Sequence, residues 1–186
     1  MEGPANKRPR KERLDKYCWN CHNPNGALRG CSNCFRTFHR ECMEQSDRLA
    51  ISIDWFCPEC RAYDNRKVEN PFDLSCLLDY LMKNVLNQEI HENLGGLFEN
   101  IICSNNKIVK PMNIKIIQNK INEHKYDSTL EFLSDIKLIH HNAEIAFANK
   151  TNVLKQIQNL EKACASKVLD LNVCADCFRN SHEKAD

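Results

Sequence analysis

Eight cysteine and histidine side chains between residues 18 and 60 have the spacing of metal ligands. The pattern is C-x2-C-x9-C-x2-C-x4-H-x2-C-x14-C-x2-C, formed by Cys18, Cys21, Cys31, Cys34, His39, Cys42, Cys57 and Cys60. Structural zinc is tetrahedral and takes thiolate or imidazole ligands, so eight ligands predict two zinc ions. So short a segment cannot bury enough apolar surface to offset its chain entropy. We therefore expect metal binding to supply the folding free energy of this part of the chain.

Metal binding also changes the charge of the chain. Seven thiolates and two divalent ions contribute −7 + 4 = −3, which takes the formal net charge from +1 to −2. Arg29, Arg36 and Arg40 lie among the ligands and are expected to balance part of this negative charge.

The composition of the chain is that of one or two small soluble domains: 186 residues, 42% hydrophobic and 27% charged. No apolar run is long enough to cross a membrane, and residues 1–16 lack the apolar segment of a secretory signal. We expect the chain to stay inside the cell, without a membrane partner. Its twelve cysteines would then meet a reducing compartment, where thiols bind metals more often than they form disulfides.

After the cysteine-rich segment, the apolar residues recur with the period of a helix. A first helix is predicted from Pro71 to about residue 87, with Asn70 as its cap. A second follows Pro111 and ends near His124 or Lys125, and a third begins at a capping box, Ser128-x-x-Glu131. A fourth carries apolar residues from 153 to 168. These helices and one long connection, residues 88–110, predict a helical bundle.

The resulting organisation has five parts. We predict a basic disordered tail at 1–16, a zinc finger at 17–63, a linker at 64–70, a helical bundle at 71–170 and a partial zinc-binding segment at 171–186. The tail contains the run KRPRKER, residues 7–13. Because the rest of the chain is close to neutral, we expect at most weak, salt-dependent, non-specific DNA binding from it.

The order of four cysteines, one histidine and three cysteines, with Trp55 two residues before Cys57, resembles the PHD finger family. This resemblance implies interleaved ligand sets, with Cys18, Cys21, His39 and Cys42 on one zinc and Cys31, Cys34, Cys57 and Cys60 on the other. A RING finger has a different ligand order. A ubiquitin or SUMO ligase platform is therefore a less favoured alternative.

PHD fingers commonly bind the histone H3 tail as an added strand, and the resemblance places that strand beside Ala27, Leu28 and Arg29. Methyl-lysine recognition requires an aromatic cage. Trp19 lies between two ligands and Trp55 is expected to be structural, so no cage is evident. Ala27, Ser32 and Asn33 stand where acidic groups that recognise unmodified lysine are expected.

Residues 111–142 resemble the bromodomain signature, through Pro111-Met112, Tyr126, and then Phe132, Asp135, Leu138 and Asn142. The resemblance implies an all-α left-handed four-helix bundle. Bromodomains bind the acetyl-lysine carbonyl with an asparagine amide, and Phe147 occupies that position here. A phenylalanine offers no donor. We therefore predict a degenerate pocket filled by Phe147, with Asn142 as a structural residue; Asn149 is an alternative donor only if the loop is reshaped.

The order of modules, together with Tyr17-Cys18-Trp19, Cys34-Phe35-Arg36 and His141-Asn142, resembles the MYND-domain-containing chromatin readers, in which a PWWP domain follows the bromodomain. By this resemblance the chain stops before that domain, and Cys174 and Cys177 are half of a zinc site. Cys164 and His182 could complete a third site instead. The family implies a nuclear, chromatin-associated module without enzymatic activity, acting with transcriptional co-regulators, of co-repressor type. His140 and His141 have no nucleophile or paired carboxylate at a recognisable spacing and are expected to be surface or core histidines.

Overall fold

The computed structural model describes residues 13–49, 54–64, 70–86, 105–147 and 151–182. Within these ranges it gives no side-chain description for 63–64, 71, 151 and 170–182. The basic run at residues 7–12 and most of the predicted connection 88–110 therefore lie outside the described residues, as do Cys103 and Asn149.

The cysteine-rich part folds with very little regular secondary structure. Strands β1 (Leu28–Gly30) and β2 (Thr37–His39) pair antiparallel, with Leu28 opposite His39. A 3-10 turn, η1 (Arg40–Cys42), and helix α1 (Gln45–Leu49) follow, and helix α2 (Pro58–Asp64) ends the module. Strands of three residues contribute few backbone hydrogen bonds, so the metal ligands must hold these segments together. We call the described residues 13–64 the zinc module.

In the remaining part, the described residues form a bundle of four helices, as the sequence predicted. These are α3 (Pro71–Val85), α5 (Ile114–Asn122), α6 (Thr129–Ala146) and α7 (Thr151–His182). Three of them begin at side-chain caps: Asn70 accepts from the Phe72 N–H, Asn113 from the Ile116 N–H, and Ser128 from the Glu131 N–H. Each cap satisfies a backbone donor that the first helical turn leaves unpaired. The cap predicted at Ser128 is therefore present, and the Glu131 carboxylate accepts from the Asp127 N–H, one residue before the position that a full capping box uses.

The bundle core is apolar, with one buried polar network inside it. Side chains that are at most 2% exposed come from all four helices, among them Leu74, Leu78, Ile117, Phe132, Ile136, Ile139, Ile157 and Leu160. Tyr126 follows α5 and donates its hydroxyl to Asp135 Oδ2 at 3.0 Å, and Lys120 Nζ lies 2.6 Å from the same oxygen. Burial, followed by the Asp135 charge, raises the pKa of Tyr126, so its hydroxyl stays protonated and donates. This network fixes α5 against α6.

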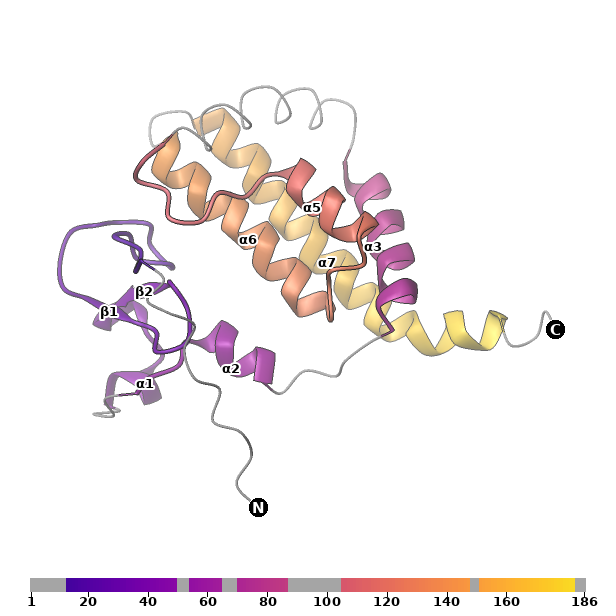
Figure 1. The fold of residues 1–186 in the computed structure, drawn as a ribbon, viewed down its shortest axis with the longest axis horizontal. Helices are drawn as coiled ribbons and strands as arrows, with labels where there is room; N and C mark the ends of the chain where they lie inside the picture. Colours follow the sequence, from indigo (N-terminus) through magenta and orange to yellow (C-terminus); the bar gives the residue numbers. More distant parts are fainter. Residues whose placement is uncertain (1–12, 50–53, 65–69, 87–104, 148–150, 183–186) are drawn as a thin grey trace, which may run out of the picture.

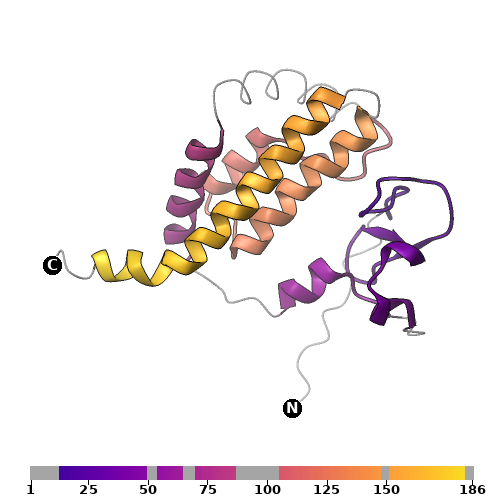
Figure 2. The same ribbon diagram turned by 180° about the vertical axis from the view of Figure 1, so that it is seen from behind.

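The zinc module lies beside α6, and the two parts share one hydrophobic core. Figures 1 and 2 show α2 next to the part of α6 that begins the helix, and residues of the two helices are in contact. The chain already makes specific contacts before residue 17, where the zinc finger was predicted to begin. Asp15 is buried, and its N–H donates to the Phe35 carbonyl at 2.8 Å.

Helix α7 continues through the region predicted to hold a third zinc site. Its C-terminal end extends past the base of α3, away from the zinc module (Figures 1 and 2). Cys164 and Cys174 are ten residues apart on this helix, which corresponds to about 15 Å. Cys164 is also fully buried in the bundle core, where burial raises its pKa to about 12. The alternative in which Cys164 shares a metal with Cys174 is therefore wrong, and a half-site at Cys174 and Cys177 stays a prediction. In the part of the chain that the structure describes, no helix has the length and apolarity needed to cross a membrane.

Replacing the Ser128 cap tests the start of α6. Ser128→Ala should lower the free energy of unfolding by about 0.5 to 2 kcal/mol, because the Glu131 N–H loses its acceptor. Chemical denaturation followed by circular dichroism measures the change. Ser166→Ala, on the exposed side of α7, is the control and should be neutral or slightly stabilising. Equal effects of the two substitutions would contradict the capping role.

Candidate metal centres and the module junction

The eight predicted ligands form two separate clusters. Cys18, Cys21, His39 and Cys42 make the first, the mixed-ligand site, and Cys31, Cys34, Cys57 and Cys60 make the second, the all-thiolate site. Within each cluster all the ligand atoms lie within 4.8 Å of one another. Sulfur atoms of the all-thiolate site approach to 3.8 Å, for Cys31 with Cys60 and for Cys34 with Cys57. These distances suit a tetrahedral zinc, so the predicted metal and the interleaved ligand sets are confirmed.

The orientation of His39 is set by a contact behind the metal site. His39 Nε2 lies 2.7 Å from the Asn25 carbonyl. A carbonyl only accepts, so Nε2 carries the proton and Nδ1, which faces Cys21 at 3.2 Å, keeps its lone pair for the metal. The loop that presents Asn25 turns at Gly26, whose φ is 103°, a conformation that favours glycine.

Hydrogen bonds lower the pKa of the Cys18 thiol and so favour its thiolate form. Burial alone raises the pKa of Cys18, but backbone N–H groups of Cys21, His39 and Asn20 bring it down to about 7. At Cys42, burial and the neighbouring thiol groups raise the pKa to about 12. Clustered thiols cannot all ionise without a compensating positive charge. A zinc ion supplies that charge, which makes metal binding and folding of the module one event.

The two tryptophans are both packed inside the protein. Trp55 is 4% exposed and meets Phe38 edge-on at 5.3 Å, with the Arg29 guanidinium 5.4 Å from its ring centre. Trp19 is 6% exposed. The centre of its ring lies 4.3 Å from Arg36 Cζ and 4.8 Å from the centre of the His141 ring. Both rings are thus mostly covered by neighbouring side chains.

Trp19 and its neighbours form the junction between the zinc module and α6. His141 of α6 is 1% exposed, and its Nε2 lies 3.1 Å from Asp15 Oδ2, while its Nδ1 lies 2.9 Å from His22 Nδ1. Burial, followed by the charges of His141 and His140, lowers the pKa of His22 to about 4, so His22 is neutral near pH 7. Asp15, His141 and His22 therefore form a buried hydrogen-bonded chain that crosses from one module to the other.

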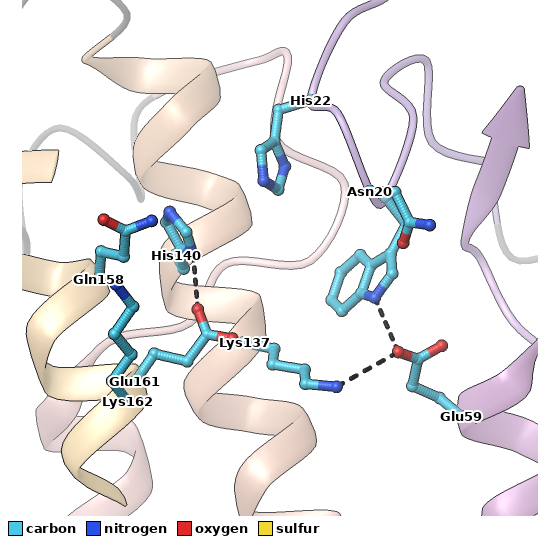
Figure 3. Close-up of a pocket in the computed structure, with 9 residues that line it drawn as sticks. Asn20, His22, Glu59, Lys137, His140, Gln158, Glu161 and Lys162 are labelled. Atoms are coloured by element: carbon cyan, nitrogen blue, oxygen red, sulfur yellow. Dashed lines mark hydrogen bonds and ion pairs between the residues drawn. The ribbon is translucent and has the colours of Figure 1, made fainter. Parts of the chain in front are cut away.

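A pocket of about 300 Å³ opens beside this junction. Its walls come from the zinc module and from α6 and α7, and they include Trp19, Asn20, His22, Glu59, Lys137, His140, Gln158, Glu161 and Lys162 (Figure 3). Glu59 Oε1 accepts from the Trp19 indole at 3.0 Å and lies 3.7 Å from Lys137 Nζ. His140 Nδ1 lies 2.5 Å from Glu161 Oε2, and this hydrogen bond raises the pKa of His140. Acidic and basic groups of the walls therefore largely pair with each other.

Sequence reasoning did not find this junction. It placed Asp15 in a disordered tail and considered His140 and His141 separately from the zinc ligands. The predicted surface or core environment of the two histidines agrees with the structure, but the contact of His141 with Asp15 spans 126 residues of sequence. No local pattern marks such a contact.

Asn142 and Phe147, the two residues assigned to a degenerate acetyl-lysine pocket by the sequence, are both buried. Asn142 is 2% exposed and donates from Nδ2 to the Lys110 carbonyl at 2.9 Å, which ties α6 to the segment before α5. This is the structural role predicted for Asn142. Phe147 follows α6 directly, is 4% exposed and belongs to the hydrophobic core, and its N–H donates to the Ala143 carbonyl.

Removing one ligand tests the metal assignment. Cys60→Ala should lower bound zinc by one ion per chain, because three thiolates hold the metal much less tightly than four. Elemental analysis of the purified protein measures the stoichiometry. Cys76→Ala is the control, since Cys76 is exposed on α3 and belongs to neither cluster. An unchanged zinc content in Cys60→Ala would contradict the assignment.

Comparison with known proteins agrees with this architecture. Residues 78–159 match the bromodomain family model. The chain is 29% identical over 175 residues to the MYND-type zinc finger-containing chromatin reader Zmynd8 of Drosophila melanogaster, a match that covers 90% of this chain and 10% of that protein.

Two further relatives match a smaller share of this chain. A putative histone-lysine N-methyltransferase 1 of Plasmodium falciparum (isolate 3D7) is 31% identical over 139 residues, 71% of this chain and 2% of the relative. The E3 ubiquitin-protein ligase TRIM33 of Danio rerio is 27% identical over 173 residues, 80% of this chain and 14% of the relative. The chain thus spans at most about a seventh of each of these three proteins. It consists of two Cys/His zinc-binding clusters followed by a helical bromodomain region.

Proposed function

We propose that this chain is a chromatin-associated interaction module in which a PHD-type zinc finger is packed against a bromodomain that does not read acetyl-lysine in the ordinary way. The match to the bromodomain family and the similarity to a protein named as a chromatin reader support the association with chromatin. The ligand order and the interleaved clusters support the PHD assignment. The module would act in the nucleus, holding partners in transcriptional regulation of the co-repressor type.

The single observation that carries the altered reading is the environment of Phe147. An acetyl-lysine carbonyl that enters an apolar pocket must leave its water behind and find a donor. Phe147 provides none, and leaving such a carbonyl unpaired costs on the order of 1 to 3 kcal/mol. The side chain is also buried, so it fills volume inside the protein. Asn142 does not replace the donor, because its side chain is 2% exposed and is held by the Lys110 carbonyl.

The chemistry of the described residues favours binding over catalysis. The eight zinc ligands complete two four-ligand sites and leave no position for a reacting water. The histidines of the junction pair with Asp15, His22, Glu144 and Glu161, and no nucleophile lies among these partners. We therefore propose that the chain is not an enzyme, in contrast to the ligase and methyltransferase named among its relatives.

Titration with acetylated peptides tests this proposal. Isothermal titration calorimetry with acetylated histone peptides should detect no binding stronger than that of the same peptides without the acetyl group. A Phe147→Asn variant that keeps the wild-type circular dichroism spectrum supplies a donor and should bind the acetylated peptides more tightly. Binding of the unmodified chain with the affinity of an ordinary bromodomain would refute the altered-pocket proposal.

A second candidate function, recognition of the histone H3 tail, is supported by the position of β1. Among the described residues, the sheet has two strands, and β1 pairs with β2 along one side. Ala27 is exposed, and Leu28 and Arg29 are partly exposed. An edge strand of this kind accepts an extended peptide through backbone hydrogen bonds. The packed tryptophans argue against a cage for methylated lysine.

Peptide titration followed by NMR tests this second candidate. An unmodified H3 N-terminal peptide should shift the amide signals of residues 27–30 and leave those of α7 unchanged. A peptide trimethylated at lysine 4 should bind no more tightly, since Trp19 and Trp55 are both packed inside the protein and form no aromatic cage with each other. Shifts confined to the bundle, or none at all, would exclude tail recognition at β1.

A further inference from the structure

Arg36 connects the all-thiolate site of the zinc module to helix α6 of the bundle. Its Nη1 lies 3.5 Å from Cys34 Sγ, and its Nη2 donates to Ser134 Oγ at 2.5 Å. The guanidinium stacks on the Trp19 ring at 4.3 Å. Arg36 is 9% exposed, so these contacts are made away from bulk water. One planar group therefore touches a metal ligand, the junction tryptophan and the bundle at the same time.

The positive charge of Arg36 is opposite in sign to the charge of the all-thiolate site that it contacts. Four thiolates and one zinc ion give the all-thiolate site a formal charge of −4 + 2 = −2. The Arg36 guanidinium places a positive charge 3.5 Å from a ligand sulfur of this site, Cys34 Sγ. Among the three arginines expected to balance the thiolates, Arg36 donates to a ligand sulfur. Arg29 faces Trp55, and Arg40 donates to the Arg48 carbonyl.

The geometry links the strength of both contacts. A guanidinium has rigid donor geometry, so the orientation that lets Nη1 reach Cys34 Sγ is also the one that places Nη2 on Ser134 Oγ. The Cys34 thiolate needs the positive charge most when the site is fully ionised, which is the metal-bound state. Zinc in the all-thiolate site then holds Arg36 in the orientation that reaches Ser134. In the same way, Ser134 holds Arg36 in the orientation that reaches Cys34.

We propose that Arg36 is a positioning residue through which zinc binding at the all-thiolate site and docking of the bundle stabilise each other. This goes beyond the proposed function, because it concerns how the two modules are joined and not what they bind. The coupling is reciprocal, as thermodynamic linkage requires. A substitution on α6, in the other module, must therefore change metal retention at the all-thiolate site and leave the mixed-ligand site unaffected.

Metal release from the intact chain, followed site by site, tests the proposal. Cadmium NMR of the cadmium-loaded protein distinguishes a site with four sulfur ligands from one with three sulfurs and one nitrogen. Loss of each signal after addition of a chelator gives two separate rates. Ser134→Ala should speed release from the all-thiolate site, but by less than the roughly tenfold or more that removing a direct outer contact of a metal ligand causes. Arg36→Gln should speed it further.

The controls separate positioning from general loosening. Arg36→Lys keeps the charge but not the two-pronged geometry, and its release rate should fall between those of the wild type and Arg36→Gln. Arg13→Gln removes an exposed charge of the same module and should leave both rates unchanged. Hydrogen exchange of α6 amides around Ser134 gives the reciprocal readout: Arg36→Gln should increase exchange there. The proposal is overturned if Ser134→Ala leaves release from the all-thiolate site unchanged, or if it accelerates both sites equally.

Discussion

Coordination of eight side chains by two metal ions is the constraint on which the zinc module depends. Its strands are three residues long, and its helices α1 and α2 have five and seven residues. Such short elements cannot hold each other in place by backbone hydrogen bonds alone. The ligands join segments that are far apart in sequence, because Cys31 and Cys34 share a site with Cys57 and Cys60. The metal thus replaces the apolar core that a larger domain would have.

Helix α6 depends on this constraint in turn, because it uses the zinc module as a packing partner. Ser134 and His141 face the zinc module, whereas Asn142 binds the segment before α5. A buried Asp15 facing a buried His141 would be costly if either lost its partner. His141 can therefore be buried on the side of α6 that faces the zinc module, because Asp15 supplies its partner there. The junction and the acetyl-lysine region therefore share one helix.

The proposed function follows from Phe147, the residue directly after α6. The bromodomain resemblance places an asparagine donor at this position. A bromodomain pocket without an asparagine donor keeps its fold, because the fold rests on apolar packing and capped helices. By the proposed function, it lacks the hydrogen bond that would hold an acetyl-lysine carbonyl. Phe147 is buried in the hydrophobic core, where it contributes to packing. A module of this type is suited to holding partners through surfaces such as β1.

The sequence by itself determined the ligands, their metal, and the caps of α3 and α6 at Asn70 and Ser128. Metal-ligand spacing, helix caps such as Ser128 and the apolar period are local, so residues close together in the chain are sufficient to predict them. The altered pocket stays a prediction, made locally from Phe147 at the position where the bromodomain resemblance places an asparagine. What only the tertiary structure decided is the junction, where Asp15 and His141 meet, and the role of Arg36 between Cys34 and Ser134. These contacts join residues about a hundred positions apart. Which residues meet depends on how the two folded modules pack against each other. No short sequence pattern specifies that packing.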